Sequence, residues 1–171
     1  MYDGLKGHLE LLETGALAPH FTLLGIDGKE YSLPKDAGGQ PMLLVFFKTT
    51  CGTCDTAFPY VNRLRETYPE GWQLWAIAQD PPRGAAQYAR RQGIEYPVLV
   101  DAPDYSASRL HDPAATPSLF LNDASGRTVF ATHGFAKDDM NELAALIAQL
   151  VGAEPVIIAP ENDGGPAFKP G

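Results

Sequence analysis

The sequence predicts an α/β fold in which a mixed central sheet is covered by helices on both faces. Three observations support this prediction. Continuous apolar runs, typical of buried strands, alternate along the chain with stretches of helical periodicity. Two strand-like runs close together before a final amphipathic helix indicate an antiparallel edge. At 171 residues and 44% hydrophobic composition, the chain is large enough to fill one such core.

The first predicted elements are a β-hairpin, a buried strand and a helix. Residues 21–33 bracket Asp27-Gly28, a dipeptide that favours a two-residue hairpin turn. Residues 42–47 are apolar throughout, which is typical of a central strand buried on both faces. The pattern then changes to helical spacing, and Pro69 and Gly71 are expected to end this helix. Its apolar positions include Phe58, Val61, Leu64 and Tyr68.

The rest of the chain repeats this alternation of strands and helices. Further strands are predicted at residues 72–78, 97–100, 118–121 and 128–131, and helices at residues 83–92 and 105–111. A final helix has acidic residues in its first turn, where the helix dipole favours them, and one apolar face. That face consists of Met140, Leu143, Ala144, Ile147, Leu150 and Val151. The predicted order is therefore a β-hairpin followed by βαβαβαββα.

We expect one folded domain at residues 18–151, preceded by an N-terminal segment at residues 1–17. Residues 152–171 form a Pro- and Gly-rich C-terminal tail without helical periodicity. Within the tail, residues 155–159 are apolar and suited to local pairing or packing. The tail is suited to covering a groove, packing on a sheet edge or mediating self-association, and the sequence leaves these three roles open.

The composition excludes some classes of partner. The chain carries 13 Lys and Arg against 21 Asp and Glu, for a net charge of −8. Binding to a phosphate backbone needs clustered basic side chains, so nucleic acid is not an expected partner. The first ten residues lack a basic stretch followed by an apolar run, so neither a signal peptide nor a transmembrane segment is predicted. The default expectation is a cytoplasmic protein, which a removed signal or anchor would make extracytoplasmic.

The two cysteines, Cys51 and Cys54, are the strongest chemical signal in the sequence. They directly follow the predicted strand at residues 42–47, at the strand end where reactive groups collect in parallel sheets. Their spacing places both sulfurs on one side of the first helical turn, within reach of a disulfide bond. The pair therefore predicts a reversible dithiol–disulfide couple.

The two sulfurs are expected to have different roles. The unpaired N–H groups and the dipole at the start of the helix favour the thiolate form of Cys51, and a nearby Lys48 ammonium would add to this effect. Cys51 is therefore the expected nucleophile. Cys54 lies one turn deeper and is expected to resolve a mixed disulfide by attacking the Cys51 sulfur.

Three alternatives to a redox role compete. In the first alternative, both cysteines are core thiols without a redox role, since free cysteine is among the most buried residue types. Half of a zinc site is disfavoured because the four histidines are scattered along the chain and form no pair with ligand spacing. A permanent structural disulfide would contribute little, because the loop that it closes is so short. The context after a buried strand favours the redox role, with no metal and no cofactor.

The segment Cys51-Gly52-Thr53-Cys54, with Phe46-Phe47 before it and Phe58-Pro59 after it, resembles the thioredoxin-like superfamily. The resemblance extends over residues 18–151 and implies a three-layer α/β sandwich. It implies a cis proline at Thr116-Pro117 that faces the cysteines and offers backbone hydrogen bonds to an extended substrate. It also implies that Gly134 borders the substrate groove and that Gly52 and Thr53 help to set the reduction potential.

The predicted N-terminal hairpin and the inserted helix-strand unit at residues 83–100 are similar to larger redoxins. These are the proteins related to alkyl hydroperoxide reductase and thiol-specific antioxidant proteins, and the thioredoxins of cytochrome maturation. The chain departs from typical thioredoxins at Val45, where they keep a buried acid, and from the cytochrome-maturation thioredoxins at Ala57, where they commonly keep a Glu. These acids are the usual proton acceptors for the buried cysteine. Topology suggests other carboxylates for this role. The candidates are Asp80, Asp101 and Asp104.

The sequence therefore predicts a thiol-disulfide oxidoreductase that acts on protein disulfides or dithiols in redox homeostasis and exchanges electrons with an unidentified reducing partner. One alternative is an antioxidant peroxidase with Cys51 as the peroxidatic residue. In that case the family pattern requires a threonine at position 48, but the chain has Lys48, and Thr49 is out of register by one. The other alternative is a non-catalytic redox-sensing module whose disulfide changes a partner surface.

Overall fold

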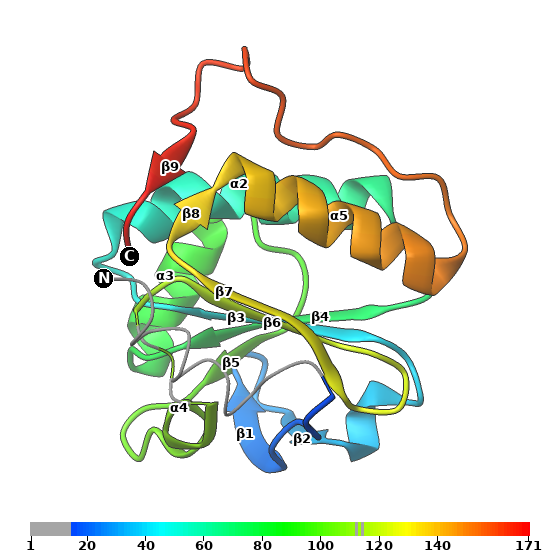
Figure 1. Cartoon of the computed structure of the whole chain (residues 1–171). Helices are drawn as coiled ribbons and strands as arrows, with labels where there is room; N and C mark the ends of the chain where they lie inside the picture. The colour runs from blue at the N-terminus through cyan, green and yellow to red at the C-terminus, as the bar shows by residue number, and fades with distance from the viewer. Residues whose placement is uncertain (1–14, 112, 114) are drawn as a thin grey trace.

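The central sheet of the computed structural model has seven strands (Figure 1). The structure describes residues 15–111, 113 and 115–171, so the predicted N-terminal segment at residues 1–17 lies mostly outside the described residues. The strands are β1 (Phe21–Gly25), β2 (Glu30–Leu33), β3 (Met42–Phe47), β4 (Gln73–Ala78), β5 (Val98–Val100), β6 (Ser118–Asn122) and β7 (Thr128–His133). Their order across the sheet is β2-β1-β5-β4-β3-β6-β7.

The pairing of these strands confirms the predicted mixed sheet. Strands β3, β4 and β5 are parallel and form its centre. The N-terminal hairpin β1–β2 extends one side, with β1 antiparallel to β5. Its turn contains Asp27-Gly28, but the loop between the paired Gly25 and Lys29 has three residues rather than the predicted two. The β6–β7 hairpin closes the other side, antiparallel to β3. Strand β3, which leads to the cysteines, is therefore held by a neighbour on each side.

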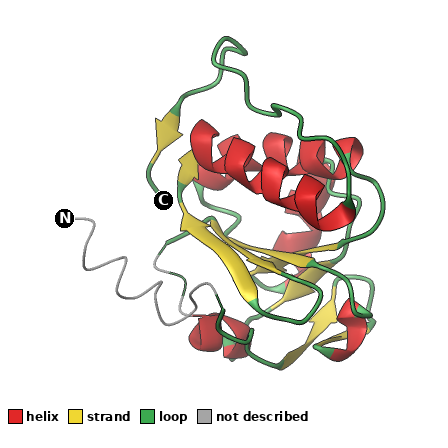
Figure 2. Cartoon of the chain, turned by 45° about the vertical axis from the view of Figure 1, so that its right-hand side comes forward, coloured by secondary structure: helices red, strands yellow, loops and turns green. Residues whose placement is uncertain are grey.

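Helices cover both faces of the sheet, as Figure 2 shows. The helices are α2 (Gly52–Thr67), α3 (Pro82–Gln92), α4 (Ser106–His111) and α5 (Lys137–Val151), with a short 3-10 turn, η2 (Lys35–Ala37), that the sequence does not predict. Alternate residues of β3 point into two separate cores. Val45 and Phe47 pack with α2, α3 and α5, whereas Leu44 and Phe46 pack on the face that α4 covers. All four side chains are fully buried.

One predicted core residue lies at the surface. Leu150 is expected on the apolar face of α5 but is exposed. The buried positions Ala144, Ile147 and Ala148 follow the i, i+3, i+4 pattern, which continues to Val151 and turns position 150 away from the sheet. None of the helices in the described part of the chain has the length and apolar content that crossing a membrane requires.

The C-terminal segment, residues 152–171, returns over the outer side of α5 and α2 (Figure 1). Within it, Ile158 and Ala159 are buried in the core that α2 and α5 share. The segment ends in a strand, β9 (Phe168–Lys169), which pairs antiparallel with β8 (Phe135–Ala136). Strands of two residues carry almost no sequence signal, and neither is predicted from the sequence. The tail therefore packs on the domain along much of its length.

Candidate active site

The Cys51 sulfur caps the start of α2. Strand β3 ends at Phe47, and Cys51 takes the extended conformation of a helix N-cap, with φ −95° and ψ 109°. Its Sγ accepts a hydrogen bond from the backbone N–H of Cys54 at 3.1 Å. This is the position in which serine, threonine or aspartate oxygens usually satisfy the free N–H groups of a helix. A negative charge on this sulfur therefore has a hydrogen-bond donor and the positive end of the helix dipole beside it.

Cys54 lies one turn further along and is fully buried. Burial raises the pKa of the Cys54 thiol, and the adjacent Cys51 sulfur raises it further. A backbone hydrogen bond from Lys48 and the side chain of Thr116 act in the opposite direction. Both thiols are free, and Cys51 is only half-buried. This difference in exposure agrees with the predicted roles, in which Cys51 meets the substrate and Cys54 reacts only with Cys51.

The Thr116–Pro117 peptide bond is cis, as the resemblance implies. It lies directly against the cysteines, because the Cys51 thiol donates a hydrogen bond to the Thr116 carbonyl at 3.2 Å. Gly134 joins the same cluster through its N–H, which donates to the Pro117 carbonyl at 2.8 Å. The structure thus brings together Cys51, Thr116, Pro117 and Gly134. That the last three bind substrate stays a prediction.

The three residues expected to modulate the site differ in exposure and in contacts. They are Lys48, Gly52 and Thr53. The Lys48 side chain is exposed, and no hydrogen bond or ion pair in the described part of the chain joins it to Cys51. Its backbone contributes instead, because the Lys48 carbonyl accepts from the N–H of Cys51 at 3.3 Å. Gly52 is exposed, whereas Thr53 is buried and donates its hydroxyl to the carbonyl of Pro170. Thr53 therefore contacts the C-terminal segment, which the sequence does not reveal.

Two of the three carboxylates proposed as proton acceptors have structural partners instead. Asp80 accepts from the N–H of Thr49 at 2.8 Å and from its hydroxyl at 2.9 Å. Asp101 caps α4 by accepting from two of its backbone N–H groups. Asp104 is exposed. Among the described residues, none of the three is hydrogen-bonded to Cys54, so the predicted proton acceptor is not found at these positions.

A different acid lies beside the pair. Asp55, next to Cys54 in the sequence, accepts a hydrogen bond from the Tyr88 hydroxyl at 2.9 Å. Burial raises the pKa of Tyr88, Asp55 raises it further, and the two cysteines add smaller effects. Tyr88 comes from α3 and packs against both Phe47 and Phe58, with ring centroids 5.0 and 5.7 Å away. The sequence misses this contact because it joins two helices that are far apart along the chain.

Replacing Asp80 with alanine is expected to loosen the loop that presents Cys51. The change leaves the Thr49 N–H and hydroxyl without their charged acceptor, at a cost of about 1–3 kcal/mol in the free energy of unfolding. Urea denaturation measures this loss, and stopped-flow oxidation of the dithiol measures the slower reaction of Cys51. Thr49→Val removes only the hydroxyl bond and should cost less. Equal stability and reactivity of Asp80→Ala and the wild type would contradict the role of this contact.

The cysteine site has no neighbouring set of metal ligands. Among the described residues, no three His, Cys, Asp or Glu side chains are grouped so that they could hold a metal ion. His111, the only histidine that is fully buried in the described part of the chain, lies among Phe21, Phe46 and Phe120 on the opposite face of the sheet. The chemistry that the arrangement supports is thiol–disulfide exchange.

Comparisons with known proteins agree with this geometry. A model of the AhpC/TSA family matches residues 14–130. The thiol-disulfide oxidoreductase ResA of Geobacillus thermodenitrificans (strain NG80-2) is 28% identical over 131 residues, which cover 75% of this chain and 74% of that protein. ResA of Bacillus anthracis is 29% identical over 131 residues, covering 75% of each. The crystal structure of a putative thiol:disulfide interchange protein DsbE from Chlorobium tepidum matches with a TM-score of 0.75 at 29% identity, covering 82% of this chain and 99% of that one.

Proposed function

Because this chain belongs to the AhpC/TSA family and is a thiol-disulfide oxidoreductase with a Cys51–Cys54 pair, we propose that it reduces disulfides of protein substrates. The observation that carries the proposal is the asymmetry of the pair. The Cys51 sulfur is half-buried at a helix N-terminus, beside the Thr116 carbonyl, while Cys54 is fully buried behind it. The names of the relatives support the same class of reaction.

The proposed reaction has two exchange steps. The Cys51 thiolate attacks one sulfur of the substrate disulfide, and the other sulfur leaves with the bonding electrons and takes up a proton. Cys54 then loses its proton and attacks the Cys51 sulfur, which releases the second substrate thiolate. When this thiolate takes up a proton, equivalent to the one that Cys51 released on forming its thiolate, two electrons and two protons have passed from the dithiol to the substrate. A reducing partner returns the Cys51–Cys54 disulfide to the dithiol.

Protein substrates are favoured over peroxide by the contacts of Thr49. Its hydroxyl donates to Asp80 and is therefore committed away from the Cys51 sulfur. A peroxide pocket needs donors aimed at the peroxide oxygens beside the attacking sulfur. The backbone of Thr116 and Gly134 lies beside Cys51 instead, and backbone groups of this kind are suited to pairing with an extended polypeptide.

The proposal is tested by mixing the reduced protein separately with insulin and with hydrogen peroxide at equal concentrations. We expect faster oxidation by insulin, formation of a Cys51–Cys54 disulfide, and no reaction of Cys51→Ser with either oxidant. A faster reaction with peroxide would indicate a peroxidase instead. If oxidation forms the disulfide and changes partner binding without any turnover, the protein is a redox-sensing module.

A further inference from the structure

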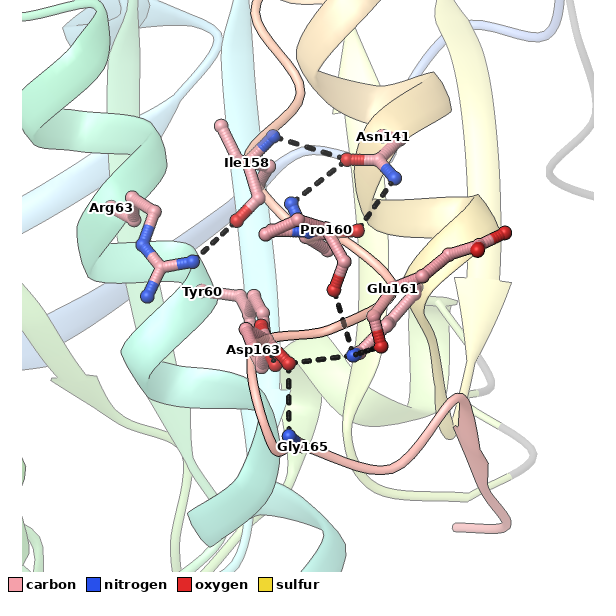
Figure 3. Close-up of polar contacts among 10 residues, drawn as sticks. Tyr60, Arg63, Asn141, Ile158, Pro160, Glu161, Asp163 and Gly165 are labelled. Carbon is pink, nitrogen blue, oxygen red and sulfur yellow. Dashed lines mark hydrogen bonds and ion pairs between the residues drawn. The ribbon is translucent and has the colours of Figure 1, made fainter.

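The C-terminal segment is fixed to the domain before it reaches the cysteines. Lys137, the first residue of α5, has a side chain that is almost fully buried, and its Nζ forms an ion pair with Asp163 at 2.6 Å. The same ammonium donates to the carbonyls of Pro160 at 2.8 Å and Glu161 at 3.2 Å. The Tyr60 hydroxyl of α2 donates to the other oxygen of Asp163 (Figure 3). A buried ammonium with three acceptors holds the segment in one place.

A second group of contacts holds the preceding turn. Asn141 of α5 accepts from the N–H groups of Ile158 and Ala159 and donates to the Ala159 carbonyl, so its amide pairs with the segment in both directions. Arg63 of α2 donates to the Ile158 carbonyl (Figure 3). The backbone of the segment is therefore hydrogen-bonded to both helices that cover this face of the sheet, and its course toward the cysteines is fixed.

After these contacts and the turns and bends at residues 161–165, the segment passes alongside Gly134 as the short strand β9. The N–H of Lys137 donates to the Ala167 carbonyl at 2.9 Å, and β9 pairs with β8, with Phe135 opposite Lys169. A Cβ atom added to Gly134 would lie 3.0 Å from the N of Gly171 and 3.1 Å from the Lys169 carbonyl oxygen. Such a close approach of two backbones is possible only because position 134 has no side chain.

The last residues contact the cysteine site itself. Thr53, between the two cysteines, donates its hydroxyl to the Pro170 carbonyl. The Lys169 ammonium donates to the Gly52 carbonyl at 3.3 Å. Gly171 lies so close to the cis-proline loop that a Cβ added to it would be 2.8 Å from the Thr116 carbonyl oxygen. The segment thus touches the two residues between the cysteines and the backbone of Thr116 and Gly134.

We propose that residues 168–171 occupy the groove in which an extended protein substrate docks, so that a substrate must displace them to pair with the backbone beside Cys51. This inference rests on the proposed function. The segment is tethered, so it competes at a fixed and high local concentration that a substrate must exceed. A small disulfide needs only the Cys51 sulfur and not the groove. The segment therefore slows the reaction with protein substrates and leaves the reaction with small disulfides nearly unchanged.

The test compares the full chain with a variant that ends at Ala167. Dithiol oxidation is followed by stopped flow with insulin and with 2-hydroxyethyl disulfide. Removal of residues 168–171 is expected to accelerate the reaction with insulin about tenfold, the effect of one or two lost hydrogen bonds, and the small disulfide less than about twofold. Asp163→Asn, which weakens the Lys137 contact without shortening the chain, should have the same kind of effect as the truncation: a faster reaction with insulin and little change with the small disulfide. Ile157→Ala, at an exposed side chain of the same segment, is the matched control and should leave both rates unchanged.

A synthetic peptide of residues 163–171 provides an independent measurement. Calorimetry should detect its binding to the variant that ends at Ala167 and no binding to the full chain. Unchanged insulin rates, or equal acceleration of both disulfides, would overturn the inference while leaving the proposed function intact. If neither protein reacts with insulin, the proposed function fails, and the peptide alone decides: binding to the shortened variant supports occupancy of the groove, and absence of binding overturns it.

Discussion

Replacing Cys54 with serine is expected to stop turnover and to leave the substrate covalently bound to Cys51. The first exchange step needs only the Cys51 sulfur, which stays at the helix N-terminus in this variant. The second step needs a buried thiol one turn away, and a serine hydroxyl does not attack a disulfide under these conditions. Steady-state turnover should fall by a factor of at least about 100, the order of loss when a covalent intermediate cannot resolve.

The trapped species identifies the two roles directly. Non-reducing electrophoresis and mass spectrometry should show a mixed disulfide between the Cys54→Ser variant and a protein substrate, and dithiothreitol should release it. The Cys51→Ser variant should form no such adduct, because Cys54 is fully buried. The chain has only two cysteines. Normal turnover by Cys54→Ser would therefore mean that an external thiol resolves the intermediate, and would contradict the assignment of Cys54.

Acidification from pH 7 to pH 4 is expected to lower the free energy of unfolding through His111. This side chain is 2% exposed, lies against Phe46 and Phe120, and hydrogen-bonds through Nδ1 to the Ala107 carbonyl at 2.9 Å. Its Nε2 is buried, with no hydrogen-bond partner among the described residues. Burial lowers the pKa of His111 from 6.5 to about 4, because the aromatic core does not solvate an imidazolium.

The sign and size of this effect follow from proton linkage. Between pH 6.5 and pH 4 the unfolded chain binds a proton at this position that the folded protein does not, so stability falls as the pH falls through this range. The loss should total about 3 kcal/mol and level off below pH 4. Urea denaturation of the wild type and of His111→Leu at several pH values isolates the contribution, because carboxylates titrate in both. Parallel stability curves for the two proteins would show that His111 does not titrate in this way.

The parts of the fold that the sequence predicts are those with a local signal. The apolar run at residues 42–47 identifies the central strand, and Asp27-Gly28 identifies the hairpin turn. The spacing of Cys51 and Cys54 after that strand predicts a redox pair at the start of a helix, and the structure places both residues at the start of α2. Each of these features depends on neighbours within a few residues, so the chain shows it without tertiary information.

The contacts that the sequence does not reveal join distant residues. Asp80 is a reasonable proton acceptor by topology, but the fold places the backbone N–H of Thr49 against its carboxylate. Lys137 stands beside two acids in the first turn of a helix, where a lysine is usually solvated, and only the returning chain with Asp163 encloses it. The course of residues 152–171 depends on such side-chain contacts rather than on periodicity, so its packing is visible only in the structure.

The Cys51 sulfur caps a helix and carries out the redox chemistry with the same atom. The dithiol and the disulfide forms can differ in how strongly this sulfur accepts hydrogen bonds from the N–H groups at the start of α2. Any such difference must change both the relative folding stability of the two forms and the reduction potential. The two quantities are equal around a thermodynamic cycle of folding and oxidation. Substitutions in the first turn of α2 that stabilise one redox form more than the other should thus shift the reduction potential of the Cys51–Cys54 disulfide without replacing either cysteine.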